Sequence, residues 1–254
     1  MSGPVGLAVI GLGPAAEPHA KALAELAGRA RVVWAATRSQ ARADAAAARY
    51  GWPVTTDIAA AIADPAVRAV LVLTPPAAHL EIARQAFAAG RHVLVEKPLE
   101  LTSARAAALV AASAGLRLGV VLQHRFRDGA VALRDLLASG RLGAVQAASM
   151  AVPWWRPQSY YDEPGRGSLA RDGGGVLLTQ AIHTLDLFRA LLGVRRVVAA
   201  QARTTGLHRM QTEDHVQALV ELGEGAPASI LATTAAYPGR AESIEVIGML
   251  GTAR

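Results

Sequence analysis

The sequence of 254 residues contains no cysteine, and this absence excludes several kinds of chemistry. Without thiolates the chain can form no disulfide, iron–sulfur cluster or cysteine-ligated zinc site, and it has no cysteine nucleophile. It also lacks any apolar run of the ~18 residues that a membrane-spanning helix needs. Its first residues have neither the basic nor the apolar region of a secretory signal, so we expect a cytoplasmic protein.

Lysine is nearly as scarce as cysteine. Lys21 and Lys97 are the two lysines among 26 basic residues, so arginine supplies most of the net charge of +6. The arginines are scattered, with Arg195-Arg196 as the densest spot, which is typical of a solvated surface. We therefore expect no nucleic-acid partner, although a pI of about 10.4 keeps a nucleic-acid-binding module as an alternative. The seven histidines form no HxH or HxxxH pair, so no metal site is predicted.

The first half of the chain alternates short apolar runs with alanine-rich helical stretches. Parallel strands need a helix to return the chain, so this alternation predicts an α/β fold with a doubly wound parallel sheet over residues 1–123. Strands are expected at 5–10, 31–36, 69–73, 92–95 and 117–122, with helices at 15–26, 39–50, 77–89 and 103–114.

From residue 124 onward the strands follow one another with fewer helices between them. This pattern predicts a second, α+β domain over residues 124–254 with an open, mainly antiparallel sheet. Helices are expected at 130–138 and 175–192, an irregular loop at 153–172, and strands at 144–152, 197–205, 215–222, 228–236 and 243–247. The sequence ends where a further strand is expected to start, so we expect this domain to be shortened at its C-terminus.

A GxGxxA pattern, Gly11 to Ala16, lies between the first strand and the first helix. Glycines at this turn let a pyrophosphate approach the backbone at the helix N-terminus, so a dinucleotide site is predicted. The second strand ends in Thr37-Arg38-Ser39 and offers no carboxylate to the ribose, which favours NADP over NAD. The alternative is that Arg38 is a solvated surface residue and Ser39 only a helix cap.

Lys97 follows a buried strand at the end of a parallel sheet where ligands bind. Because the chain otherwise uses arginine, an amine here suggests proton transfer, which arginine cannot perform. On the second long helix, Thr179, His183 and Asp186 fall at i, i+4 and i+7 and are predicted to share one face beside a flexible triple glycine. His183 is a candidate acid/base, and Asp186 either holds its imidazole or finishes the helix face.

Several motifs together resemble the Gfo/Idh/MocA family of NAD(P)-dependent oxidoreductases. They are Gly11-Leu12-Gly13 with His19, Thr74-Pro75-Pro76 with His79, Glu96-Lys97-Pro98, Gln123-His124-Arg125-Phe126, and Gly173-Gly174-Gly175 followed by Gln180 to Asp186. The resemblance implies a Rossmann domain followed by an α+β domain whose open sheet serves substrate binding and subunit association. It also implies that Lys97 lies near the nicotinamide and the substrate hydroxyl, with His183 as acid/base.

The expected site residues follow from these motifs and the resemblance. The catalytic residues are Lys97 and His183. The cofactor-binding residues are Gly11, Leu12, Gly13, Pro14, Ala15, Ala16, Thr37, Arg38, Ser39, Arg42, Thr74, Pro75, Pro76, His79, Glu96, Lys97, Gln123 and Arg166. The substrate-binding residues are Lys97, Arg125, Tyr160, Tyr161, Thr179, Gln180 and His183. Apart from the resemblance, His19 and His79 are expected as helix-packing or turn residues, and the aromatic residues near 160 form either a sugar-stacking platform or the loop's own small core.

We therefore expect an oxidoreductase, NADP-preferring with NAD possible, that moves a hydride between nicotinamide and a secondary alcohol or ketone of a sugar, cyclitol or related small molecule. A homo-oligomer formed through the second sheet is expected. The alternative is a non-catalytic dinucleotide-binding or truncated pseudo-enzyme subunit.

Overall fold

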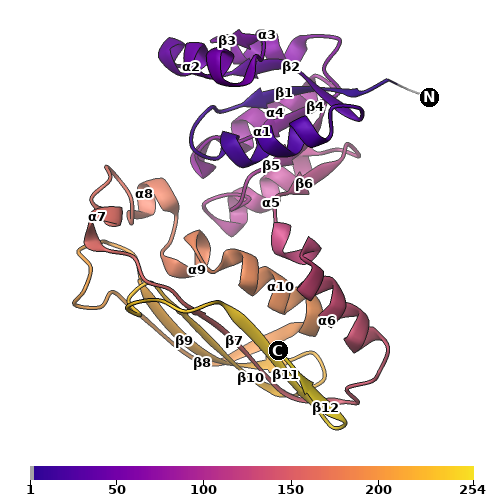
Figure 1. Ribbon diagram of the computed structural model, residues 1–254. Coiled ribbons are helices and arrows are strands. Elements are labelled where there is room, and N and C mark those ends of the chain that lie inside the picture. The colour runs from indigo at the N-terminus through magenta and orange to yellow at the C-terminus, as the bar shows by residue number, and fades with distance from the viewer. Residues whose placement is uncertain (1–2) are drawn as a thin grey trace. The chain divides into compact units, whose positions relative to one another are not determined.

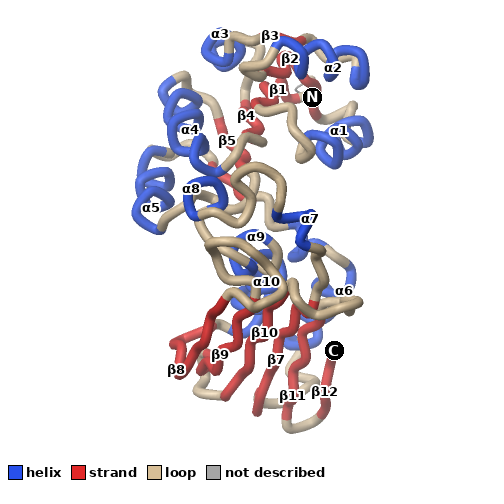
Figure 2. Tube along the Cα trace, turned by 90° about the vertical axis from the view of Figure 1, so that its left-hand side faces the viewer, coloured by secondary structure: helices blue, strands red, loops and turns tan. Residues whose placement is uncertain are grey.

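The computed structural model describes residues 3–254, which divide into two compact units. The first unit ends at Val121 and the second begins at Leu122. Figures 1 and 2 show a sheet with flanking helices in each unit. Within residues 3–254, no helix is both long and apolar enough to cross a membrane.

The first unit is a parallel sheet whose six described strands run in the order β3-β2-β1-β4-β5-β6. Its elements are β1 (Val5–Ile10), α1 (Ala16–Glu25), β2 (Ala30–Ala36), α2 (Gln40–Tyr50), β3 (Val54–Thr55), α3 (Ile58–Ala63), β4 (Ala69–Val72), η1 (Pro76–Ala78), α4 (His79–Ala88), β5 (His92–Val95), α5 (Ser103–Ala112) and β6 (Leu118–Val120). The predicted doubly wound sheet is confirmed. The prediction missed β3 and α3, because a two-residue strand has no alternation of its own and pairs only with the end of β2.

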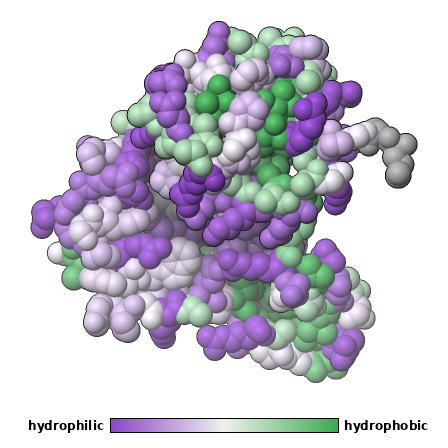
Figure 3. Space-filling view, turned by 45° about the horizontal axis from the view of Figure 1, so that its top comes forward, coloured by the Kyte–Doolittle hydropathy of each residue, from purple (hydrophilic) through white to green (hydrophobic). Residues whose placement is uncertain are grey.

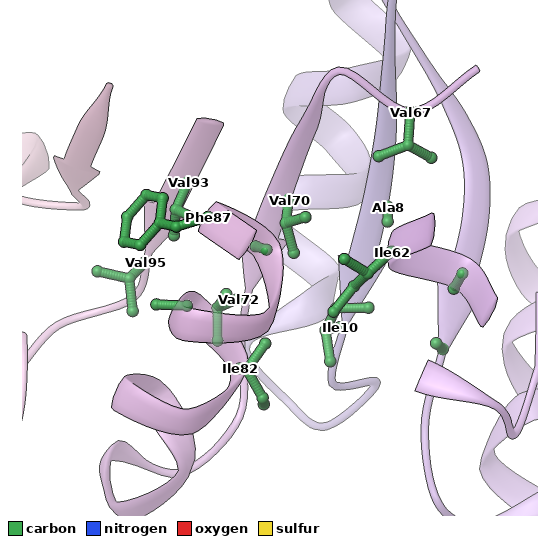
Figure 4. Packing of buried hydrophobic residues seen from close by; sticks show 14 of the residues in the cluster. Ala8, Ile10, Ile62, Val67, Val70, Val72, Ile82, Phe87, Val93 and Val95 are labelled. Atoms are coloured by element: carbon green, nitrogen blue, oxygen red, sulfur yellow. The ribbon is translucent and has the colours of Figure 1, made fainter. Parts of the chain in front are cut away.

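Apolar side chains of the central strands fill the core between this sheet and its helices. Figure 4 shows strand residues from β1, β4 and β5 packed against Ile62 of α3 and against Ile82 and Phe87 of α4. The opposite face of the same strands buries Val9, Leu71 and the first residue of α1. Burial on both faces explains why these strands read as continuous apolar runs.

The second unit is a mixed sheet with the order β12-β11-β7-β10-β9-β8. Its elements are η2 (Gln123–Phe126), α6 (Asp128–Ala138), β7 (Val145–Pro153), α7 (Gln158–Tyr161), α8 (Leu169–Asp172), α9 (Val176–Thr179), α10 (Ile182–Leu192), β8 (Val194–Arg203), β9 (His215–Leu222), β10 (Pro227–Thr233), β11 (Ser243–Gly248) and β12 (Gly251–Ala253). β7 and β10 pair in parallel, and the other neighbours are antiparallel. The open, mainly antiparallel sheet is confirmed. The short strand β12 lies at the end of the sequence, where a further strand was expected to start.

One face of the second sheet is covered by helices and the other is open. Figure 1 shows α6, α9 and α10 on the same side of the strands, where alternate residues such as Val216, Val220 and Ile230 are buried. On the other face Leu219 and Ile247 keep 57% and 43% of their surface exposed, and no residue of β8 is buried. Large apolar side chains on this open face therefore lie in contact with solvent.

The predicted single helix over residues 175–192 is wrong. The Ala181 N–H bonds to Val176 O (2.8 Å), five residues back, which interrupts the α-helical pattern between α9 and α10. Thr179 Oγ1 donates to Gly175 O (2.7 Å) within the short first helix. The predicted common face of Thr179, His183 and Asp186 is therefore wrong as well, because the backbone turns between the first two. The loop predicted at 153–172 contains two single turns of helix, α7 and α8.

Candidate active site

The glycine turn after β1 lies at the carboxyl edge of the first sheet. Gly11 has φ +103°, and a Cβ there would lie 2.8 Å from both Leu73 C and Thr74 N, so the protein's own packing requires glycine. A Cβ on Gly13 would meet no atom within 4 Å, so the space above Gly13 is open. Ala16, which replaces the third glycine of the motif, is buried where α1 packs on the sheet. The open space beside the start of α1 fits the diphosphate of a dinucleotide.

The end of β2 places two polar side chains beside this turn. Thr37 is buried and Arg38 is exposed. Ser39 caps α2 by accepting from Arg42 N (3.4 Å), as the predicted cap requires, and its hydroxyl proton stays available as a donor. Arg42 is exposed in the first turn of α2. The strand end therefore offers two exposed guanidinium groups and no carboxylate.

His79 holds two loops of this edge together. It is fully buried, with Nε2 donating to Thr74 O (2.8 Å) and Nδ1 facing Leu99 O (3.2 Å). These contacts fit the helix-packing or turn role considered for His79, and its expected cofactor-binding role stays a prediction. Its imidazole links the segment after β4, which carries Thr74, Pro75 and Pro76, to the segment after β5.

Glu96 ties the start of α1 to the loop that carries Lys97. His19 Nε2 donates to Glu96 Oε1 (2.8 Å), and the Lys97 N–H donates to Glu96 Oε2 (3.0 Å). Burial by itself would raise the pKa of Glu96, but the hydrogen bond and charge of His19 and the Lys97 amide outweigh it, so the pKa lies below its usual range. The carboxylate is therefore ionised near neutral pH and fixes the backbone at Lys97.

The second unit brings the predicted residue His183 next to a polar segment, η2. The ring of His183 stacks on His124, with centroids 4.9 Å apart and planes at 30°. Arg125 donates from Nε and Nη2 to the two oxygens of Asp186, both at 2.6 Å. Asp186 therefore binds the guanidinium of Arg125. The sequence suggested that Asp186 either holds the His183 imidazole or finishes the helix face, and this contact is neither of the two. Gln123, at the start of η2, is exposed.

The last residue of the triple glycine before α9 packs closely against another segment of the chain. A Cβ on Gly175 would lie 1.9 Å from Glu213 O, so only glycine fits this approach of two chain segments. The Glu213 carboxylate accepts from Gly175 N (3.0 Å) and Leu177 N (3.4 Å), and its main-chain carbonyl accepts from Val176 N (2.8 Å). An acidic side chain thus caps the start of α9, a stabilising place for negative charge.

The aromatic loop of residues 154–167 carries the predicted residues Tyr160, Tyr161 and Arg166. The guanidinium of Arg166 lies 4.1 Å from the centre of the Tyr160 ring, and Gln180 Nε2 donates to Tyr160 Oη (3.4 Å). Tyr161 is buried, and its hydroxyl bonds to Thr234 Oγ1 (2.7 Å). Tyr161 therefore packs in the loop's own small core, and its expected substrate-binding role stays a prediction. Thr179 Oγ1 also bonds to its neighbour Gln180.

Two polar networks in this unit were not predicted from the sequence. His208 and Asp214 have fully buried side chains and form an ion pair (2.6 Å) behind the aromatic loop, with His208 Nε2 donating to Arg156 O (2.8 Å). Glu242, just before β11, accepts from Thr184 Oγ1 (2.5 Å) and Arg127 Nη1 (2.8 Å). Their partners lie far apart in the sequence or in loops without periodicity. Residues 3–254 contain no group of three His, Asp or Glu side chains that could hold a metal ion.

The two predicted catalytic residues belong to different units, Lys97 to the first and His183 to the second. On the face in Figure 3, hydrophilic residues are interspersed with apolar ones.

Comparison with known proteins identifies the family. The family model described as an oxidoreductase family with an NAD-binding Rossmann fold matches residues 5–123, and the Gfo/Idh/MocA C-terminal domain matches residues 101–254. Inositol 2-dehydrogenase of Streptomyces avermitilis is 41% identical over 147 residues, which cover 56% of this chain and 43% of that protein. Inositol 2-dehydrogenase of Rhizobium meliloti is 29% identical over 252 residues, 96% of this chain and 73% of that protein. 1,5-Anhydro-D-fructose reductase of Ensifer adhaerens is 34% identical over 67% of this chain and 51% of its own length.

Solved structures of two dehydrogenases are similar to this chain over nearly its whole length. The WlbA dehydrogenase from Bordetella pertussis, in complex with NADH and UDP-GlcNAcA, has a TM-score of 0.93 at 30% identity, over 99% of this chain and 76% of that one. Levoglucosan dehydrogenase, in complex with NADH and levoglucosan, has a TM-score of 0.87 at 26% identity, over 98% of this chain and 72% of that one. The chain thus spans about half the length of two of the three relatives named above. Because family models match both units, the chain belongs to the Gfo/Idh/MocA family of oxidoreductases, with an NAD-binding Rossmann fold followed by the family's C-terminal domain.

Proposed function

We propose that this protein is an NAD(P)-dependent oxidoreductase that interconverts a secondary alcohol and a ketone of a sugar, cyclitol or related small molecule. The observation that carries the proposal is the carboxyl edge of the first sheet, where the open space above Gly13 adjoins the start of α1 and the Lys97 loop is fixed through Glu96. Relatives named as inositol dehydrogenase and anhydrofructose reductase support the substrate class.

The residues of this edge fit a nicotinamide dinucleotide. The turn from Gly11 to Ala16 would hold the diphosphate, and Thr74 to Pro76 would lie along the ribose and ring portions. Further contacts are proposed for Glu96, Gln123 and Arg166. When bound, the nicotinamide supplies the carbon that accepts or donates the hydride.

Lys97 and His183 are the proposed catalytic residues. The Lys97 ammonium would donate a hydrogen bond to the oxygen at the reacting carbon, which stabilises the charge that develops there as the hydroxyl proton leaves. His183 would take that proton and exchange it with solvent, a task suited to imidazole near neutral pH. Substrate hydroxyls are proposed to bind Arg125, Tyr160, Thr179 and Gln180, each of which carries a polar group.

We also propose a preference for NADP. Arg38 and Arg42 are exposed beside the glycine turn, and the Ser39 hydroxyl keeps its proton for donation. Charge-assisted hydrogen bonds from such groups suit a 2′-phosphate, and no carboxylate is present there to repel it.

The open face of the second sheet is the proposed contact between subunits. Leu219 and Ile247 keep 57% and 43% of their surface exposed on this face, and exposed large apolar side chains are typical of a contact surface. Burial of such a surface against a second copy would form a homo-oligomer.

Titration and turnover of two lysine variants test the proposal. The purified protein is titrated with NADPH and NADH by calorimetry and then assayed with a panel of sugars and cyclitols. Lys97→Met should lower turnover by at least ~10²-fold with little change in dinucleotide affinity. Lys21→Met is the matched control, because Lys21 is the other lysine and its side chain is 76% exposed. Dinucleotide binding without turnover over the whole panel would favour a non-catalytic subunit, and unchanged turnover in Lys97→Met would overturn the mechanism.

A further inference from the structure

Two buried histidines of the second unit lie ring on ring. His124 comes from η2 and His183 from the start of α10, and both have less than a tenth of their surface exposed. Their centroids are 4.9 Å apart and their planes meet at 30°. A stacked ring fixes the orientation of its neighbour, because rotation of either imidazole would break the contact.

Glu242, in the segment before β11, contacts His124 and the residue next to His183. Its carboxylate accepts from Thr184 Oγ1 (2.5 Å), the residue next to His183, and from Arg127 Nη1 (2.8 Å). The same Oε1 lies 3.5 Å from His124 Nδ1. The side chain of Glu242 is only 19% exposed, so these contacts are partly shielded from water and salt.

We propose that His124 and Glu242 are positioning residues for His183. Glu242 fixes the first turn of α10 through Thr184 and holds the His124 ring, and His124 supports one face of the His183 imidazole. This inference rests on the acid/base role proposed above for His183, whereas the contacts themselves do not.

The charged groups around the stacked rings of His124 and His183 favour protonation of only one of the two rings at a time. Burial lowers the pKa of His124 and the charge of Arg127 acts in the same direction, against the opposing effect of Glu242. Arg125 of η2 and Asp186 of α10, the charged residues that follow His124 and His183 in these elements, pair with each other. A second proton would place two cations 4.9 Å apart. Protonation of one ring therefore disfavours protonation of the other, so the two rings are expected to titrate as a coupled pair.

Histidine NMR titration tests the coupling without any substrate. Resonances of the two rings are assigned with His124→Phe and His183→Gln in the full-length protein. In each variant the remaining histidine no longer has a second ring beside it that can take up a proton. The ring that titrates at the lower pH in the wild type should therefore have its midpoint raised by about one pH unit when the other ring is replaced. His92→Gln removes an imidazole from the first unit, keeps an acceptor for the Arg117 N–H, and should move neither midpoint. Independent titrations, with both midpoints unmoved, would overturn the inference.

Turnover measurements then separate positioning from simple packing. His124→Ala should lower kcat at least ~10-fold with little change in the KM for dinucleotide, because a displaced base loses its alignment. His124→Phe keeps an aromatic ring and should recover most of that kcat, and Glu242→Gln should shift the pH profile of kcat. Equal kcat in His124→Ala and wild type would also overturn the inference. If the two rings titrate as a coupled pair but the protein shows no turnover, the stacked arrangement of His124 and His183 is supported. Such a result would contradict the proposed function and not the contact between the two rings.

Discussion

Replacing Asp214 tests the buried network behind the aromatic loop. Asp214 is fully buried, and its carboxylate accepts three hydrogen bonds. Thr205 N donates to Oδ1 (2.7 Å), and Thr205 Oγ1 (2.7 Å) and His208 Nδ1 (2.6 Å) donate to Oδ2. Asp214→Ala removes the acceptor of all three donors and leaves His208 without its counter-charge.

The expected loss follows from these contacts. Each stranded buried donor costs about 1–3 kcal/mol, and removal of one partner of a buried ion pair costs about 3–5 kcal/mol in total. We therefore expect Asp214→Ala to lower the free energy of unfolding of the second unit by about 3–5 kcal/mol.

Asp214→Asn is the informative comparison, because an amide can rebuild the pattern. Its oxygen can accept from Thr205 N, while its NH₂ can donate one hydrogen to His208 Nδ1 and the other to Thr205 Oγ1, whose hydroxyl then accepts instead of donating. His208 then adopts the neutral tautomer that still donates from Nε2 to Arg156 O. Only the charge-assisted part is lost, so a decrease of about 1 kcal/mol is expected.

Urea unfolding, followed by circular dichroism and tryptophan fluorescence, measures these changes. Asp162→Ala is the surface control, because Asp162 is exposed and accepts one hydrogen bond from Gln158, and it should change stability by less than ~0.5 kcal/mol. If Asp214→Ala lowered stability no more than this control, the buried-network argument would be refuted.

Three further predictions concern the first unit. Gly11→Ala places a Cβ 2.8 Å from backbone atoms at φ +103° and should destabilise this unit by ~2 kcal/mol or more. Gly13→Ala should leave the melting temperature unchanged and weaken dinucleotide binding. Equal melting temperatures for the two variants would contradict the packing argument. Arg38→Asp should weaken NADPH binding by at least ~10-fold more than NADH binding in calorimetry, and equal losses would mean that Arg38 does not contact the 2′-phosphate. Because the pKa of Glu96 is lowered in the folded state, the contribution of Glu96 to stability is present above the unfolded pKa of ~4.3 and is lost as the pH falls through the folded value. Glu96→Gln should therefore flatten the acid side of the profile of stability against pH. An unchanged profile would show that Glu96 makes no such contribution.

The strands and helices of the first unit could be predicted because their signals are local. Apolar runs such as Val5 to Ile10 and the caps at Ser39 and Gly51 act within a few residues. The break between α9 and α10 could not be predicted, because the apolar spacing continues through Gln180 and Ala181. What stops the helix there is an arrangement of main-chain hydrogen bonds that leaves no mark on residue type.

The place of the glycine turn and of Lys97 at the end of a parallel strand was predictable, because the residue type is rare or its spacing specific. Contacts that depend on the tertiary fold were not predictable. Glu242 meets Thr184 across 58 residues, and nothing in its own neighbourhood distinguishes it from a solvated glutamate. The burial of His79 likewise follows from the packing of two loops and has no local signal.

Two histidines of the first unit, the partly buried His19 and the fully buried His79, have a thermodynamic consequence for ligand binding. His19 links α1 to Glu96, and His79 joins the segments that follow β4 and β5. Three chain segments at one edge of the sheet are thus cross-linked before any ligand arrives. Ordering a free loop costs about 1–2 kcal/mol of conformational entropy per residue, and this edge has already met that cost during folding. Affinity for a dinucleotide then depends mainly on the ordering of the dinucleotide itself.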